Sequence, residues 1–429
     1  MALTEKLAEF ALGPVAGKDA LQMARLSALD WAACGLAGRE EPVARALLSL
    51  AEEEAGAQQA SILGGGPRRP ARMAALVNGT MSHALDYDDT HFAHIGHPSV
   101  AVFPAAMAVA EREGRSIEDM LQAALVGMEA SVRFGVWLGR DHYQTGFHQT
   151  ATSGAIGATV AACRLLGLTP ERTVHALGLV ATRASGLKSQ FGTMGKPFNA
   201  GLAASNGVEA ALLAQRGFIS SPAALDGEQG FGPTHAGMED DSAWDGLGCD
   251  WLFETVSHKF HACCHGLHAM LEAIATLRPG LDPSQIEAVS ITTHPRWARV
   301  CNIPSPQTGL EAKFSYRLTA AMGLCGVSTA SLANFSEETA ADPALVTLRD
   351  KVMVDFDDSL LETQSRVQVV LAGGKLLEAA HDLNAPISLE ARQQRLMAKA
   401  AALIGDNEAS AIWDMLQGGG ITALVAVLK

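Results

Sequence analysis

Residues 150–166 have the sequence TATSGAIGATVAACRLL, an apolar stretch made mostly of small side chains. A membrane span needs about 18 or more consecutive apolar residues, and no run of that length occurs in the chain. Small residues on several faces let neighbouring helices approach closely, so this stretch predicts a helix that is packed on all sides. Its character therefore favours a fold built on a helical core.

Similar patterns recur through the first 250 residues. Two of the expected helices begin with capping signals, Ser116 with Asp119 three residues later, and Thr169 followed by Pro170. We expect helices at residues 18–37, 41–55, 71–85, 100–113, 116–138, 150–166, 169–183 and 200–216.

The pattern changes after about residue 255. Residues 286–294 alternate and are β-branched, which indicates a strand, and residues 366–381 predict two strands around a turn at Gly373 and Gly374. Helices are expected at 311–334, 343–350, 388–403 and 409–416. We therefore predict a mainly α protein: a large all-α helical domain (residues 1–255 plus 385–429) and a smaller α+β lid domain (residues 256–384) inserted before the C-terminal helices.

Charge and cysteine usage narrow the class of function. The chain has 32 Lys and Arg against 46 Asp and Glu, a formal net charge of −14, and it lacks basic runs. This argues against binding to nucleic acid or to an anionic membrane. The seven cysteines are scattered without a C-x-x-C pair, and the N-terminus lacks a basic region followed by an apolar core. We expect a cytoplasmic protein.

Titratable residues gather at residues 83–99, HALDYDDTHFAHIGHPS. Gly96 and Pro98 break helices, so this segment is predicted to be a loop after the helix at 71–85, with His97 at a buried helix entry. Two structural alternatives stay open: Asp88 or Asp89 could cap a short helical turn, and His83 could be an ordinary helix-surface residue.

A metal site is a further alternative for this segment. His91, His94 and His97 recur every three residues near two acids. However, Gly96 interrupts any helix, and the H-E-x-x-H pattern of zinc enzymes is absent. We favour a site without a metal.

Three other segments carry candidate binding groups. In 143–152 (YQTGFHQTAT), His148 precedes a small-residue helix whose N-terminal N–H groups favour an anion, although it could be a capping residue. In 191–201 (FGTMGKPFNAG), Lys196 could meet a carboxylate or be simply exposed, and the segment does not fit a phosphate loop. In 258–268 (HKFHACCHGLH), Lys259 lies at the predicted junction between domains, and Cys263 and Cys264 could be buried filler.

Taken in order, these four segments resemble the MmgE/PrpD family, which includes 2-methylcitrate dehydratase, cis-aconitate decarboxylase and iminodisuccinate epimerase. The resemblance covers roughly residues 1–380. It implies a helical domain with a smaller lid, a homodimer, a site in the cleft, and no metal or organic cofactor. It also implies that the family's site positions fall on six residues of this chain: Asp86, Thr90, His97, His148, Lys196 and Lys259.

Two departures bear on the substrate. Relatives that are dehydratases or decarboxylases usually have Tyr at the position of Leu318, whereas the tyrosine here is Tyr316. Many relatives also have Pro at the position of Gln149. The missing tyrosine is more similar to the epimerase branch.

We therefore expect a cofactor-independent lyase that abstracts a proton next to a carboxylate of a small di- or tricarboxylate. His97, oriented by Asp86, is the expected acid/base, with His148 as a second and Lys259 as a catalytic clamp. Substrate-binding roles are assigned to four further residues: Thr90, Lys196, Tyr143 and His91. Dehydration is expected first, epimerisation next and decarboxylation third. A metal-binding helical protein is the non-enzyme alternative.

Overall fold

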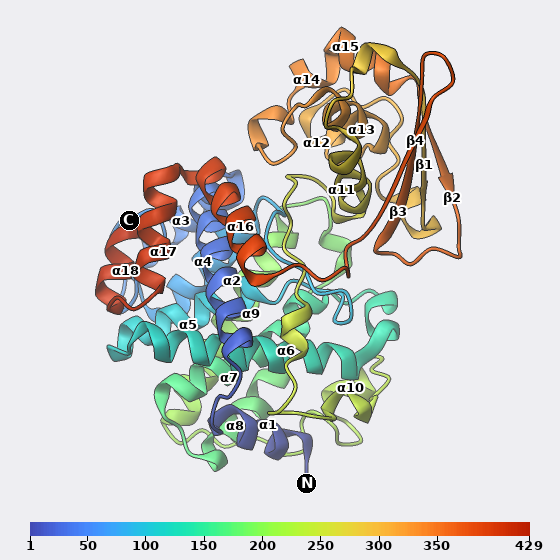
Figure 1. Ribbon diagram of the computed structural model, residues 1–429. Helices are drawn as coiled ribbons and strands as arrows, with labels where there is room; N and C mark the ends of the chain where they lie inside the picture. Colours follow the sequence, from blue (N-terminus) through green and yellow to red (C-terminus); the bar gives the residue numbers. More distant parts are fainter. The chain divides into compact units, whose positions relative to one another are not determined.

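The computed structural model describes residues 1–429 and divides into two compact units (Figure 1). Unit 1 contains Met1–His258 and Leu389–Lys429, and unit 2 contains Lys259–Ser388. Helices dominate, and the strands form one four-stranded sheet, which confirms the predicted mainly α class. None of the helices combines the length and the apolar character needed to cross a bilayer.

Unit 1 is entirely helical apart from its loops. Its α-helices are α1 (Leu3–Leu12), α2 (Lys18–Ala37), α3 (Pro42–Glu54), α4 (Ala71–His83), α5 (Ser99–Glu113), α6 (Ile117–Thr145), α7 (Gln149–Leu166), α8 (Pro170–Ala181), α9 (Gly195–Gln215), α10 (Phe231–Thr234), α16 (Leu389–Ile404), α17 (Asp406–Leu416) and α18 (Ile421–Val427). The predicted caps form: Ser116 Oγ accepts from the Asp119 N–H, and the Thr169 side chain accepts from the Arg172 N–H.

Small residues let α4, α5, α6, α7 and α9 pack closely in the core of unit 1. A Cβ atom on Gly79 of α4 would lie 2.8 Å from the Cα atom of Gly201 of α9. A Cβ on Gly207 would lie 2.6 Å from the Cβ of Ala158 in α7. These approaches are possible only without side chains, so the small-residue pattern of the sequence sets the spacing of the helices.

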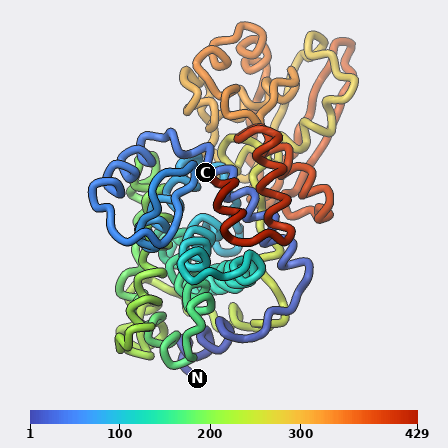
Figure 2. The backbone as a smooth tube through the Cα atoms, turned by 90° about the vertical axis from the view of Figure 1, so that its left-hand side faces the viewer, coloured from blue at the N-terminus to red at the C-terminus, as the bar shows by residue number.

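The C-terminal helices return to the N-terminal part of unit 1, as the red and blue segments of Figures 1 and 2 show, and α16 packs against α2. A buried ion pair joins the two helices, because Lys399 Nζ lies 2.5 Å from Asp30 Oδ1. The same ammonium donates to the backbone carbonyl of Tyr87 at 2.6 Å. The C-terminal segment therefore holds the loop that follows α4.

Unit 2 contains a sheet with the strand order β2-β1-β3-β4. β1 (Ile286–Thr293) is parallel to β2 (Val352–Phe356) and antiparallel to β3 (Gln364–Leu371), which forms a hairpin with β4 (Leu376–Asp382). Gly373 and Gly374 both have positive φ in the predicted turn. The helices of this unit are α11 (His268–Leu277), α12 (Gly309–Ala312), α13 (Tyr316–Cys325), α14 (Glu337–Ala341) and α15 (Pro343–Arg349), and α11 packs on β3 and β4.

Some predicted elements differ from the structure. The helix expected at 311–334 is divided, because Ser315 caps a new helix and Gly326 ends it. The helix expected at 116–138 continues to Thr145 and bends at Gly139, whose φ is 71°. Helices α1, α10, α11, α14 and α18 and strand β2 were not predicted.

Candidate functional site

The predicted titratable loop of unit 1 brings two imidazoles to one carboxylate. His83 is the last residue of α4, and its Nδ1 lies 3.0 Å from Asp88 Oδ1. His97 precedes α5, and its Nδ1 lies 2.7 Å from Asp88 Oδ2, in a tilted contact that is not a straight hydrogen bond. The two rings meet edge to face with centroids 4.5 Å apart. Asp88 therefore lies between two histidines that are 14 positions apart in the sequence.

Burial sets the charge state of this group. Burial would raise the pKa of the Asp88 carboxyl, but the adjacent His83 and His97 hold it well below its ordinary value. Burial lowers the pKa of His97 to about 4, although Asp88 opposes this shift. His97 is therefore neutral near pH 7 and able to accept a proton, while Asp88 remains ionised.

A second carboxylate lies on the other side of His97. Asp86 Oδ1 is 2.7 Å from Lys196 Nζ and 3.6 Å from His97 Nε2. Lys196 is the second residue of α9, and its ammonium lies 5.7 Å from the centre of the Phe191 ring. One carboxylate oxygen is thus close to both an ammonium and an imidazole, at a position where the Asp86 side chain is 39% exposed.

His148 also joins this cluster. It is the N-cap residue of α7, and its ring centroid lies 6.0 Å from that of His83 and 4.9 Å from that of Phe191. The side-chain amide of Asn199 donates to its Nδ1 at 3.2 Å. Burial, followed by the nearby His83 and Lys196, keeps the pKa of His148 well below its ordinary value. We define the histidine cluster as these seven residues: His83, Asp86, Asp88, His97, His148, Lys196 and Asn199.

Three predicted site residues make other contacts in unit 1. Thr90 pairs through its backbone with Ser257. The buried ring of His91 places Nε2 2.9 Å from the Leu252 carbonyl and 2.9 Å from Thr255 Oγ1. The ring of Tyr143 is covered by Lys188, whose Nζ lies 3.7 Å from its centre. The contacts of His91 are those of a structural link between two loops.

Lys259 is the first residue of unit 2, and it is buried beside Cys263 and Cys301. The preceding residue, His258, is fixed in unit 1 by a 2.9 Å contact between its Nε2 and Ser27 Oγ. The assignment of Lys259 to the site remains a prediction.

The positions of the side chains decide between the structural alternatives for His83, Asp88 and Asp89. His83 is buried, with 1% exposure, so its interpretation as a helix-surface residue is wrong. Asp89 accepts from both the N–H and the hydroxyl of Ser99, the first residue of α5, so it anchors the start of a later helix, whose N-cap residue is Pro98. Asp88 contacts imidazoles instead.

The same cluster contains possible metal ligands. One ligand atom from each of His83, Asp86, Asp88 and His97 lies within 4.8 Å of the others, and imidazole and carboxylate suit a divalent transition metal. This set differs from the His91, His94 and His97 set considered from the sequence. The Lys196 ammonium against Asp86 places a fixed positive charge where a cation would bind, which favours an anion as ligand.

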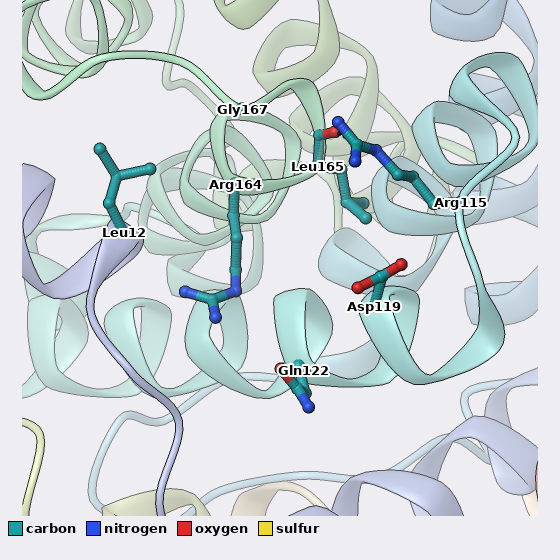
Figure 3. Close-up of a pocket in the computed structure, with 7 residues that line it drawn as sticks. All are labelled: Leu12, Arg115, Asp119, Gln122, Arg164, Leu165 and Gly167. Atoms are coloured by element: carbon teal, nitrogen blue, oxygen red, sulfur yellow. Dashed lines mark hydrogen bonds between the residues drawn. The ribbon is translucent and has the colours of Figure 1, made fainter.

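Two cavities of unit 1 lie apart from the cluster. One, of about 290 Å³, is lined by Leu12, Arg115, Asp119, Gln122, Arg164, Leu165 and Gly167 (Figure 3). Its arginines are used in the fold: Arg115 donates to the Leu165 carbonyl, and Arg164 donates to the carbonyls of Ala11 and Gly13. The other, of about 710 Å³, lies between Gly178 and His235. None of the predicted site residues lines either cavity.

Sequence reasoning missed Asn199 as a member of the cluster and left the role of His83 open. For Asn199 a signal existed, because it lies three residues after Lys196 on the same helix and therefore on the same face. For His83 the signal was its place at the start of the titratable segment 83–99, but the helical pattern did not show whether its side chain is buried.

Comparison with known families gives two matches that cover most of the chain. The MmgE/PrpD N-terminal domain matches residues 3–242, and the MmgE/PrpD C-terminal domain matches residues 261–411. The motif-bearing segments at 83–99, 143–152 and 191–201 lie in the first match, and most of the fourth, 258–268, lies in the second.

Curated relatives carry related names. Cis-aconitate decarboxylase of Aspergillus terreus is 32% identical over 277 residues, which is 61% of this chain and 56% of the relative. A cis-aconitate decarboxylase-like protein of Aspergillus oryzae is 31% identical over 61% of this chain and 58% of the relative. Human cis-aconitate decarboxylase is 27% identical over 84% of this chain and 77% of the relative. The match thus spans little more than half the length of the two fungal relatives.

Proposed function

Because the chain belongs to the MmgE/PrpD family, we propose that it is a cofactor-independent lyase that moves a proton on the carbon next to a carboxylate of a small di- or tricarboxylate. One observation carries this proposal. His97 Nε2 and Lys196 Nζ converge on one carboxylate oxygen of Asp86. A neutral imidazole and a fixed ammonium near one carboxylate oxygen are the groups that such a proton transfer requires.

The chemistry follows from the charges. The proton on a carbon next to a carboxylate is only weakly acidic, because its removal leaves an enediolate-like anion that must be stabilised. His97 has a pKa of about 4 and is therefore in the basic form at neutral pH. Lys196 stabilises the developing negative charge, and removal of one such donor costs about 2.7–4 kcal/mol of barrier.

The other residues have supporting roles in the proposal. Asp86 holds Lys196 and marks the position of a carboxylate, and His148 is the second imidazole at the reacting centre. Lys259, Thr90 and Tyr143 keep the binding roles that the resemblance and the motifs suggest, whereas the buried contacts of His91 give it a structural role. A homodimer in the cytoplasm remains part of the expectation.

The reaction type depends on which bond breaks and where the proton goes. After the proton is removed, loss of hydroxide from the neighbouring carbon gives dehydration, and return of the proton on the other face gives epimerisation. In decarboxylation no C–H bond breaks: CO₂ leaves, its electron pair stays on carbon, and an acid of the site supplies the proton that this carbon takes up. The names of the curated relatives favour decarboxylation of cis-aconitate. Leu318, at a position where dehydratases and decarboxylases usually have Tyr, favours epimerisation. Dehydration of a 2-methylcitrate-like substrate is the third candidate.

One experiment distinguishes these outcomes. The purified protein is incubated in D₂O with 2-methylcitrate, citrate, cis-aconitate and iminodisuccinate, and followed by proton NMR and CO₂ release. Formation of an olefin identifies dehydration, release of CO₂ identifies decarboxylation, and deuterium exchange without net conversion identifies epimerisation. His97→Gln is the matched control and should be inactive. If no candidate reacts or exchanges, the proposal fails, and stoichiometric metal in the purified protein would favour the metal-binding alternative.

A further inference from the structure

We infer that Asp88 and Asn199 are positioning residues that fix opposite tautomers on His97 and His148, so that His97 is the base of the reaction and His148 is a neutral hydrogen-bond donor. This inference rests on the proposed function and deepens it. The sequence does not show which of the two imidazoles is the base, whereas the contacts to their Nδ1 atoms distinguish them.

The tautomer of His97 follows from Asp88. An ionised carboxylate oxygen 2.7 Å from a ring nitrogen would repel a lone pair, so the proton of a neutral His97 is on Nδ1. Its lone pair is then on Nε2, which lies 3.6 Å from the Asp86 oxygen that Lys196 also contacts. Asp88 is fully buried and is also bonded to His83, which prevents the carboxylate from turning away. Nε2 of His97 is thereby prepared to accept a proton.

The tautomer of His148 follows from Asn199. The amide nitrogen of Asn199 contacts His148 Nδ1 at 3.2 Å and the Leu187 carbonyl at 3.5 Å. A carbonyl can only accept, so the amide group facing it is the NH₂ group. The NH₂ group donates to His148 Nδ1, which must carry a lone pair. A neutral His148 therefore has its proton on Nε2 and can donate it to an oxygen.

These assignments give a balanced proton transfer. The C–H bond breaks, its proton forms a bond to His97 Nε2, and the electron pair moves into the adjacent carboxylate. The resulting imidazolium is paired with the Asp88 carboxylate. His148 donates a hydrogen bond to the developing oxyanion and keeps its own proton, because a neutral imidazole is a weak acid. His97 then returns the proton to the leaving oxygen or to carbon.

The first test needs no substrate. The protein is labelled with ¹⁵N-histidine, and long-range ¹H–¹⁵N spectra at pH 7 distinguish Nδ1–H from Nε2–H rings. His97→Gln and His148→Gln identify the two signals by their loss. We expect Nδ1–H for His97 and Nε2–H for His148. Any other pair of tautomers overturns the inference, whatever the substrate proves to be.

The second test uses variants that alter the tautomers. Asp88→Asn can turn its NH₂ toward His97 Nδ1, and this should reduce kcat by about 10²–10⁴-fold with a smaller change in KM. Asn199→Asp should move the proton of His148 to Nδ1, lower kcat and introduce a new pKa into the pH profile, whereas Asn199→Ala should lower kcat without that pKa.

Asp89→Asn is the control, because Asp89 is equally buried and lies next to Asp88 but bonds to Ser99. Unchanged kcat in Asp88→Asn, or the same loss in Asp89→Asn, contradicts a positioning role. A wild-type protein that turns over none of the candidate substrates refutes the proposed function, while the spectra still decide the tautomers.

Discussion

Lys196 Nζ lies 2.7 Å from Asp86 Oδ1, and Asp86 holds this position with a φ of 50°. The left-handed region is uncommon for residues other than glycine, and such outliers often occur at functional sites. The backbone therefore accepts strain at the point where a carboxylate meets the ammonium. A substrate carboxylate that binds Lys196 would replace this contact with one of the same chemistry.

Lys196→Met tests the electrostatic role of the ammonium. The substitution keeps most of the side-chain volume and removes the charge. We therefore expect kcat/KM to fall by about 10²–10³-fold, with the fall in kcat larger than the rise in KM. Steady-state kinetics on the substrate identified in D₂O measures both. Lys18→Met, an exposed change at the start of α2, is the matched control. A rise in KM with kcat unchanged would instead show that Lys196 binds the ground state and the transition state equally.

The acid limb of the pH–rate profile tests His97 as the base. Its pKa of about 4 means that the proton-accepting form persists well below the ordinary histidine value. We expect log kcat/KM to stay level from pH 7 to about pH 5 and to fall as the pH approaches 4, after correction for ionisation of the substrate. A fall with an apparent pKa near 6.5 would contradict the buried, neutral state of His97.

The pH dependence of stability provides a test that is independent of activity. Burial lowers the pKa of His91, His97 and His142 to about 4, so between about pH 4 and 6.5 the unfolded chain binds more protons than the folded one. Stability therefore rises with pH across this window and is lost as the pH falls through it. His91 and His97 each contribute of the order of 3 kcal/mol. Thermal unfolding at pH 4.5 and pH 7 measures the difference.

The pKa shift of Asp89 changes stability with pH in the opposite direction, so this residue supplies the control. Its burial raises the pKa to about 7, so its contribution to stability is present at low pH and is lost as the pH rises toward 7. In Asp89→Asn this opposing contribution disappears, and the rise in Tm from pH 4.5 to pH 7 should become steeper. A flat Tm in the wild type, or a shallower rise in the variant, would show that these groups are not buried as the structure places them.

The fold was predictable from the sequence where local chemistry decides the structure. Helix α2 has the predicted bounds, and the hairpin turn falls at Gly373 and Gly374 because only glycine readily adopts two successive positive φ values. Strand β2 was missed because it is short and mostly exposed, and its pairing with β1 depends on a segment more than 50 residues away. The sequence of β2 alone does not indicate that it pairs with β1.

The site was predictable in composition but not in connectivity. His97, His148, Lys196 and Asp86 were all expected, and the structure brings them together. The carboxylate that contacts His97 Nδ1 is Asp88, whereas Asp86 lies 3.6 Å from Nε2 and was expected to orient the ring. The two acids differ by two positions in an irregular loop, where no periodicity specifies which way a side chain points.

The close approach of α4 and α9 gives the last prediction. A Cβ on Gly201 would meet the Leu76 carbonyl and Thr80 Oγ1 of α4 at less than van der Waals contact, so Gly201→Ala must push the two helices apart. Overpacking of this kind costs about 1–3 kcal/mol. Because α4 carries His83 and α9 carries Lys196 and Asn199, activity should fall even at temperatures where the variant is fully folded. Gly420→Ala, at a glycine with negative φ and open space around it, should change neither Tm nor kcat appreciably. A Gly201→Ala variant with wild-type kcat and Tm would mean that the spacing of these helices does not determine the geometry of the histidine cluster.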